Sequence, residues 1–153
     1  MPPLRAGDRV TDAMVAHVFN GVRARTLPKP EWTHPAHLVF ATALLDQQGL
    51  AGAEAAAPGL IRAYNESVGG VNDDTQGYHH TITLFFLRAI DGFLEPFSGE
   101  GRGARATRLL ASPLAAPDFP LRHYSRERLF SVDARRGWLA PDLARMERGQ
   151  TDD

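Results

Sequence analysis

The sequence predicts an all-α fold: a single-domain helical bundle of about four main helices closed by short C-terminal helices. Two observations predict this fold. Apolar side chains recur at three- and four-residue spacing along most of the chain, which is the period of an amphipathic helix. The 153 residues also contain no internal repeat and no linker long enough to separate two domains, so residues 1–153 form one domain. We expect residues 1–10 and 147–153, at its two ends, to be flexible.

The first helix is predicted to start after Thr11 or Asp12, because either residue can cap a helix N-terminus. Its apolar face consists of four side chains at helical spacing: Val15, Val18, Phe19 and Val22. Pro28 and Pro30 then interrupt the chain. The sequence therefore predicts a short amphipathic helix followed by a break.

The second helix is predicted to begin near Pro35, since proline suits the first helical position, and to end at Gly49. Its middle is apolar on nearly every side, so we expect it to be the central, most buried helix. The alanine-rich residues 51–68 come next. Their helix either kinks at Pro58 or begins there, and Gly69–Gly70 end it.

A long helix is predicted over residues 78–94, because 17 residues without a strong breaker favour a helix over a strand. Residues 95–120 are expected to be irregular, with a short helix at about 104–111 and an extended connection at 112–117. Two short helices close the domain. One follows Ser125, and the other is capped by Ser131 and stopped by Pro141.

Composition excludes several classes of function. The chain has no cysteine, which rules out disulfides, thiolate zinc sites, iron–sulfur clusters and a cysteine nucleophile. The formal net charge is −1 without a clustered basic excess, which argues against a nucleic acid partner. No apolar run approaches the roughly 18 residues of a membrane span. We therefore expect no membrane partner and a cytoplasmic location.

Four of the six histidines fall in two short motifs, WTHPAHL and GYHHTIT. His34 is expected at a helix cap and His37 three residues later, so both imidazoles share one helical face. His79 shares its helical row with core residues, whereas the row of His80 reaches a charge sooner. If the two helices pack side by side, the imidazoles of His34, His37 and His79 converge.

That convergence predicts a mononuclear metal site with an open position for water. Nitrogen and oxygen ligands suit a divalent metal ion, and zinc, iron, nickel and manganese are not distinguished by the sequence. Glu31 or His80 is predicted as a fourth ligand or a general base. The alternative is that these histidines only cap helices or satisfy buried groups, while His17 and His123 are ordinary surface histidines.

Four further residues are candidates for holding a bound cofactor or substrate. Tyr78 precedes the histidine pair, and the hydroxyl of Thr83 either bonds to the preceding helical turn or orients a ligand. Tyr124 and Arg126 belong to an arginine-rich segment that forms either an anion-binding patch or a solvated helix face.

The motifs H-x-x-H-L, Y-H-x-T-x-T and a tail Y-S-R-E-R-L…P-D-L resemble an uncharacterised bacterial protein family. They correspond here to residues 34–38, 78–83 and 124–143. The resemblance implies a small helical domain without an established activity. Family members typically carry glutamate at the position of His80, so the resemblance makes His79 the motif histidine.

Three functional hypotheses remain open from these residues. The first is a metal-dependent hydrolase or transferase that acts on a small molecule through a metal-bound water. The second is a non-catalytic helical bundle that binds a small molecule or a partner. The third is a non-haem iron oxygenase, which needs two histidines and one carboxylate. The apolar segment LVFATALL is covered by its own domain or by a second subunit of a homodimer.

Overall fold

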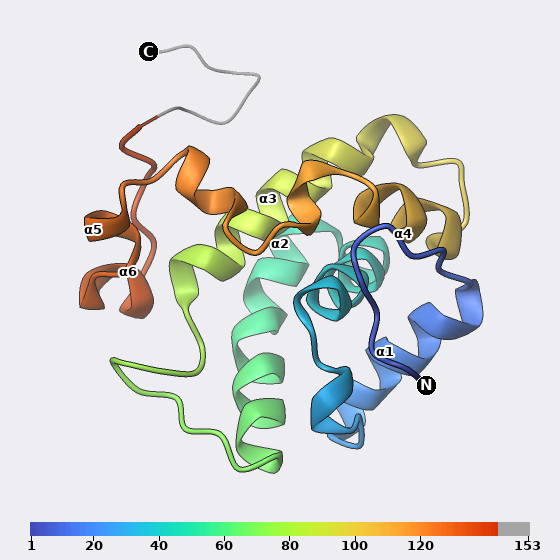
Figure 1. The fold of residues 1–153 in the computed structure, drawn as a ribbon, viewed down its shortest axis with the longest axis horizontal. Helices are drawn as coiled ribbons and strands as arrows, with labels where there is room; N and C mark the ends of the chain where they lie inside the picture. The colour runs from blue at the N-terminus through green and yellow to red at the C-terminus, as the bar shows by residue number, and fades with distance from the viewer. Residues whose placement is uncertain (144–153) are drawn as a thin grey trace.

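The computed structural model describes residues 1–143, which form a single-domain, all-α fold without a strand in that range (Figure 1). The predicted flexible end at 147–153 lies outside the described residues. The α-helices are α1 (Asp12–Ala24), α2 (His34–Ser67), α3 (His80–Leu94), α4 (Arg102–Leu110), α5 (Arg126–Leu129) and α6 (Val132–Arg136). Single 3-10 turns lie at Lys29–Glu31, Glu95–Phe97, Pro113–Ala115 and Phe119–Arg122. No helix formed by residues 1–143 is long and apolar enough to cross a membrane.

The centre of the fold is α2, which is packed against α1, α3 and α4 (Figure 1). Residues 38–45 in its first half are all buried, as expected for a helix that is apolar on nearly every side. Gly49 divides α2 into two halves, because its backbone is non-helical with φ 73° and ψ 175°. The predicted end of the central helix at Gly49 is therefore confirmed as a sharp kink, after which the helix restarts.

The second half of α2 excludes one of the two alternatives that the sequence left open at Pro58. The helix does not begin there, because Pro58 lies inside a helical segment and the residue of α2 with a non-helical backbone is Gly49. Proline lacks the amide hydrogen of a normal helical residue, so the helix lacks one backbone hydrogen bond at Pro58.

Three helix starts lie where the sequence predicts them: at Thr11, one of the two predicted candidates, after Ser125 and at Ser131. The side chain of Thr11 accepts a hydrogen bond from the Met14 amide, while Ser125 and Ser131 cap α5 and α6 in the same way. At α2, however, Thr33 is the capping residue and His34 is the first residue of the helix. The expected cap position of His34 is thus wrong by one residue.

Three other boundaries differ from the sequence predictions. The long helix α3 starts at His80, because His79 is its cap. Residues 112–117 include a 3-10 turn at Pro113–Ala115, since the Ser112 side chain accepts a hydrogen bond from the Leu114 amide. The last helix, α6, ends at Arg136, before it reaches Pro141, because Gly137 takes an extended conformation.

The N-terminal segment packs against the bundle, whereas the sequence predicts that residues 1–10 are flexible. Leu4 and Val10 are each 3% exposed and belong to the hydrophobic core. The amide of Gly7 donates to the Leu110 carbonyl at 2.8 Å, and the amide of Val10 donates to the Thr107 hydroxyl at 2.8 Å. These contacts tie the segment to α4.

Candidate functional site

An apolar cavity of about 140 Å³ lies where both halves of α2 face α3. Ten of its lining side chains are apolar: Leu38, Phe40, Ala41, Ala57, Ile61, Ile82, Phe86, Leu87, Ile90 and Pro117. Only His34, His37 and Thr83 contribute polar groups. A concave, mainly apolar space with a few polar groups is typical of a small-molecule site.

His34 stands at the first position of α2 and has a defined tautomer. Its Nε2 lies 3.0 Å from the Leu114 carbonyl oxygen, and a carbonyl only accepts, so Nε2 carries the hydrogen. Nδ1 consequently keeps a lone pair, which has no hydrogen-bond partner among residues 1–143. Burial lowers the pKa of His34, although the hydrogen bond to Leu114 opposes this shift.

His37 lies one turn further along α2 with the opposite tautomer. Its Nδ1 donates to the Thr33 carbonyl at 2.8 Å, which leaves the Nε2 lone pair available. The ring stacks on Trp32 with centroids 3.6 Å apart. Burial lowers the pKa of His37 to about 4, and the neighbouring His34 adds to the shift while the Thr33 carbonyl opposes it. His37 is therefore a neutral imidazole at physiological pH.

Thr83 supplies the third polar group of the cavity. Its hydroxyl donates to the His79 carbonyl at 2.8 Å, one of the two outcomes that the sequence left open for it. Its hydrogen is thus engaged within α3, and its oxygen retains acceptor capacity. All three polar groups in the cavity wall can accept hydrogen bonds, and none has an unengaged donor.

His79 is buried, as the sequence predicts, but its ring is engaged elsewhere. Nδ1 accepts the amide hydrogen of Ile82 at 3.1 Å and so caps α3, while Nε2 donates to the Leu129 carbonyl at 2.8 Å. Both ring nitrogens are occupied by backbone groups. The side chain joins the start of α3 to the end of α5 and does not line the cavity.

Glu31 is buried in a different polar cluster. Its carboxylate lies 2.7 Å from His17 Nε2 and 3.5 Å from the Met1 ammonium. Burial opposes ionisation, but the hydrogen bond from His17 and the charge of the Met1 ammonium outweigh it and hold the pKa of Glu31 below its usual value. Glu31 is thus paired with α1 rather than with the histidines of α2.

His80 and Tyr78 form a pair beside the cavity, outside its lining. The Tyr78 hydroxyl lies 2.9 Å from His80 Nδ1. The guanidinium of Arg62 covers the Tyr78 ring at 4.6 Å. Burial, together with the positive charge of Arg62, lowers the pKa of His80.

Tyr124 and Arg126 lie in the C-terminal part of the described chain and do not line the cavity. The Tyr124 hydroxyl donates to the Leu139 carbonyl at 2.6 Å, and burial raises the pKa of that hydroxyl. Arg126 covers the exposed ring of Phe130 at 5.7 Å. These contacts give both residues local structural partners.

The structure therefore brings together three of the predicted site residues: His34, His37 and Thr83. Among residues 1–143, no three histidine, aspartate or glutamate side chains form a group that could hold a metal ion. Metal binding consequently stays a prediction. The sequence did not identify the apolar residues of α3 and Pro117 as lining a cavity. Periodicity identifies an apolar helix face but does not show which part of that face is left without a packing partner.

Comparison with known protein families, curated proteins and solved structures found no match to this chain. The geometry of the site therefore carries the functional argument by itself.

Proposed function

We propose that this protein binds a small, uncharged, mainly apolar molecule that carries a hydroxyl or N–H group. The observation that supports this proposal is the pair of imidazoles with fixed tautomers in the cavity wall. His34 and His37 each donate one ring hydrogen to a backbone carbonyl, and each keeps one lone pair. A ligand with a hydrogen-bond donor satisfies such a lone pair.

The volume of the cavity limits the size of the ligand. A dry apolar cavity of roughly 150 Å³ in an engineered protein accommodates benzene. The cavity here has about 140 Å³ and similar aliphatic and aromatic walls. We therefore expect a ligand the size of one six-membered ring, such as a phenol or a cyclic alcohol.

The charge of the lining limits the ligand further. No acidic or permanently basic side chain lines the cavity, and the lowered pKa values keep His34 and His37 uncharged at neutral pH. A cationic ligand finds no counter-charge there, and an anionic ligand finds only acceptors. Burying either charge without a partner is costly.

The low pKa of His37 favours binding over acid–base catalysis. A general base works best when its pKa lies near the ambient pH. At about 4, the pKa of His37 is about three units below neutrality, so this imidazole is a weak base but a good hydrogen-bond acceptor. This supports a role for His37 as a hydrogen-bond acceptor over a role as a general base.

Phenol and anisole test the proposal, because the two rings are alike but anisole lacks the hydroxyl hydrogen. We expect phenol to bind about tenfold more tightly by calorimetry or ligand-observed NMR, which corresponds to about 1.4 kcal/mol and is within reach of one hydrogen bond. His37→Phe keeps an aromatic ring on Trp32 but removes the acceptor, so it should reduce the preference for phenol over anisole. His34→Phe removes the other acceptor and should also reduce this preference.

The matched control is His17→Gln, which changes an imidazole on α1 but keeps a donor for Glu31. Its preference for phenol should equal that of the wild type. Equal affinity for phenol and anisole, or no binding of either at millimolar concentration, contradicts the proposal.

A metal centre is the second candidate function. One observation favours it: His37 donates Nδ1–H to a backbone carbonyl and leaves Nε2 available, which is how imidazoles are commonly held for metal binding. Two histidines would then need further ligands from water or substrate. Elemental analysis of the untagged protein tests this idea. Stoichiometric metal that is lost in both His34→Ala and His37→Ala supports it, and metal-free wild-type protein contradicts it.

A further inference from the structure

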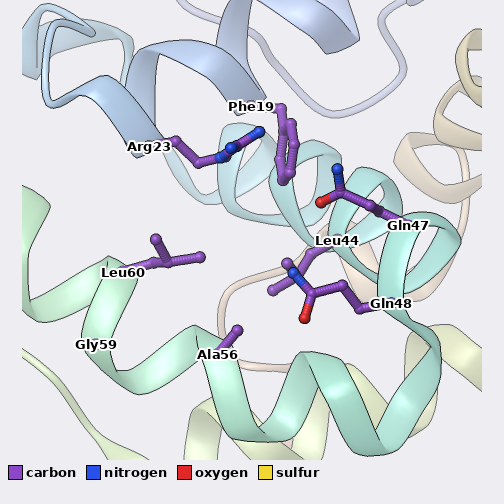
Figure 2. Close-up of a pocket in the computed structure, with 8 residues that line it drawn as sticks. All are labelled: Phe19, Arg23, Leu44, Gln47, Gln48, Ala56, Gly59 and Leu60. Atoms are coloured by element: carbon purple, nitrogen blue, oxygen red, sulfur yellow. The ribbon is translucent and has the colours of Figure 1, made fainter.

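A second concave site lies on the other side of α2 from the cavity. It is a groove of about 560 Å³ between α1 and the two halves of α2 (Figure 2). Phe19 and Arg23 extend into it from α1, and Leu44 and Leu60 come from the two halves of α2. This volume lies within the range of about 300–1,000 Å³ that is usual for sites of drug-sized ligands.

The polar groups of the groove differ in kind from those of the cavity. Arg23 places its guanidinium over the Phe19 ring, 5.2 Å from the centroid, and forms no ion pair with a carboxylate among residues 1–143. The side-chain amides of Gln47 and Gln48 stand at the groove in Figure 2. No acidic side chain lines it. The groove thus offers one positive charge and several N–H donors beside an apolar floor.

We propose that this groove binds an organic carboxylate with an apolar body. A guanidinium can donate two parallel hydrogen bonds to a carboxylate, which matches the fork geometry of Arg23. The amides of Gln47 and Gln48 orient the second face of the carboxylate. The apolar body of the ligand packs against Ala56 and Leu60, which line the groove and are partly exposed.

This site is independent of the ligand proposed for the cavity. The residues of α2 that line the groove, including Leu44, Ala56 and Leu60, are not those that line the cavity, such as Ala41, Ala57 and Ile61. The cavity offers lone pairs to a neutral donor, whereas the groove offers donors to an anion. Failure of one proposal therefore leaves the other untouched.

The test compares 4-phenylbutyrate with its neutral amide, 4-phenylbutyramide, by calorimetry on the full chain at low salt. We expect the carboxylate to bind about tenfold more tightly, because a charge-assisted pair adds to the shared apolar contact. In Arg23→Gln, which keeps amide donors but removes the charge, the two compounds should bind equally. Added salt should lower the affinity for the carboxylate but leave the affinity for the amide unchanged.

Gly59 allows the groove to be blocked without disturbing the core. A Cβ built at Gly59 meets no atom within 4 Å, so Gly59→Leu should fill the groove and abolish binding of both compounds. Gly92 in α3 is equally open but lies away from the groove, so Gly92→Leu is the matched control and should bind like the wild type. Three outcomes overturn the proposal. The first is that the wild type binds the carboxylate and the amide equally, the second is that Arg23→Gln or Gly59→Leu binds them like the wild type, and the third is that neither compound binds at all.

Discussion

At the scale of single residues, the backbone determines what the histidines of this protein can do. His34, His37 and His79 each donate a ring hydrogen to a carbonyl oxygen, so each has one defined tautomer. In His79 the remaining lone pair caps α3. His34 and His37 line the cavity, and each keeps one ring lone pair. Three residues of one type therefore have two different surroundings: one caps a helix and two line a cavity.

The cap formed by His79 can be tested by two substitutions. His79→Ala removes the acceptor for the Ile82 amide and the donor to Leu129, and should lower the free energy of unfolding by about 1–3 kcal/mol. His79→Asn restores a good capping side chain and should lose less. Urea unfolding measures both values. Equal losses for the two variants would show that the cap contributes little.

The depressed pKa of His37 predicts a pH dependence of stability. The unfolded imidazole has a pKa near 6.5 and the folded one about 4, so the unfolded state binds more protons between these values. This contribution is fully present above pH 6.5 and is lost as the pH falls towards 4, by at most about 3 kcal/mol. The denaturant concentration or temperature at the unfolding midpoint should therefore decrease as the pH is lowered from 7 to 5.

His37→Phe is the variant that isolates this effect. Its stability should decline less steeply over the same pH range, while His34 and His79, whose pKa values are also lowered by burial, retain their own contributions. The pKa of the Glu31 carboxyl group is lowered, so this group stays ionised between pH 7 and pH 5 and does not contribute to the change. If the stability of His37→Phe depended on pH as steeply as that of the wild type, His37 would not be the source of the pH dependence.

At the scale of elements, α2 determines the layout of the molecule. Its kink at Gly49 turns one helical segment into two arms, and α1 and α3 both pack against it (Figure 1). The groove and the cavity each take walls from both arms. The backbone of one glycine thus determines the walls of both proposed binding sites.

The conformation of Gly49 predicts a clear asymmetry between two glycines of α2. Gly49 combines φ 73° with ψ 175°, a region that is essentially confined to glycine. Gly49→Ala should therefore destabilise the fold by about 1–3 kcal/mol, although its Cβ meets no other atom within 4 Å. Gly59→Ala, in a helical conformation, should stabilise it by about 0.5–1 kcal/mol. Chemical unfolding compares the two, and a neutral Gly49→Ala would contradict the argument.

At the scale of the whole molecule, contacts between distant segments hold the helices together. The N-terminal segment contributes buried Leu4 and Val10, bonds to α4 through Gly7, and accepts a hydrogen bond from the capping hydroxyl of Thr33 at the Leu4 carbonyl. It therefore connects α4 with the start of α2, close to His34. This connection has no counterpart in the local sequence pattern of residues 1–10.

Leu4→Ala tests the importance of this segment. It removes a side chain that is 3% exposed and should cost about 2–5 kcal/mol, as in other buried leucine truncations. Pro3→Ala, at an exposed neighbouring position, is the control and should change stability little. A thermal or urea midpoint reports both. A wild-type midpoint for Leu4→Ala would mean that the segment contributes little to stability.

Features that depend on near neighbours can be predicted from the amino-acid sequence alone. The first helix start at Thr11 or Asp12, the helix start after Ser125, the cap at Ser131, the break at Gly49 and the proximity of His34 to His37 all depend on interactions within a few residues, which local spacing specifies. The all-α class follows from the same short-range periodicity.

Contacts between groups that are distant in the sequence could not be predicted and are visible only in the folded chain. His79 bonds to Leu129, 50 residues away, and Glu31 pairs with His17 on α1 instead of joining the histidines of α2. The cavity and the groove exist because the arms of α2 leave space against α3 and α1. Such contacts depend on how helices pack, and a helical period specifies an apolar face without specifying its partner.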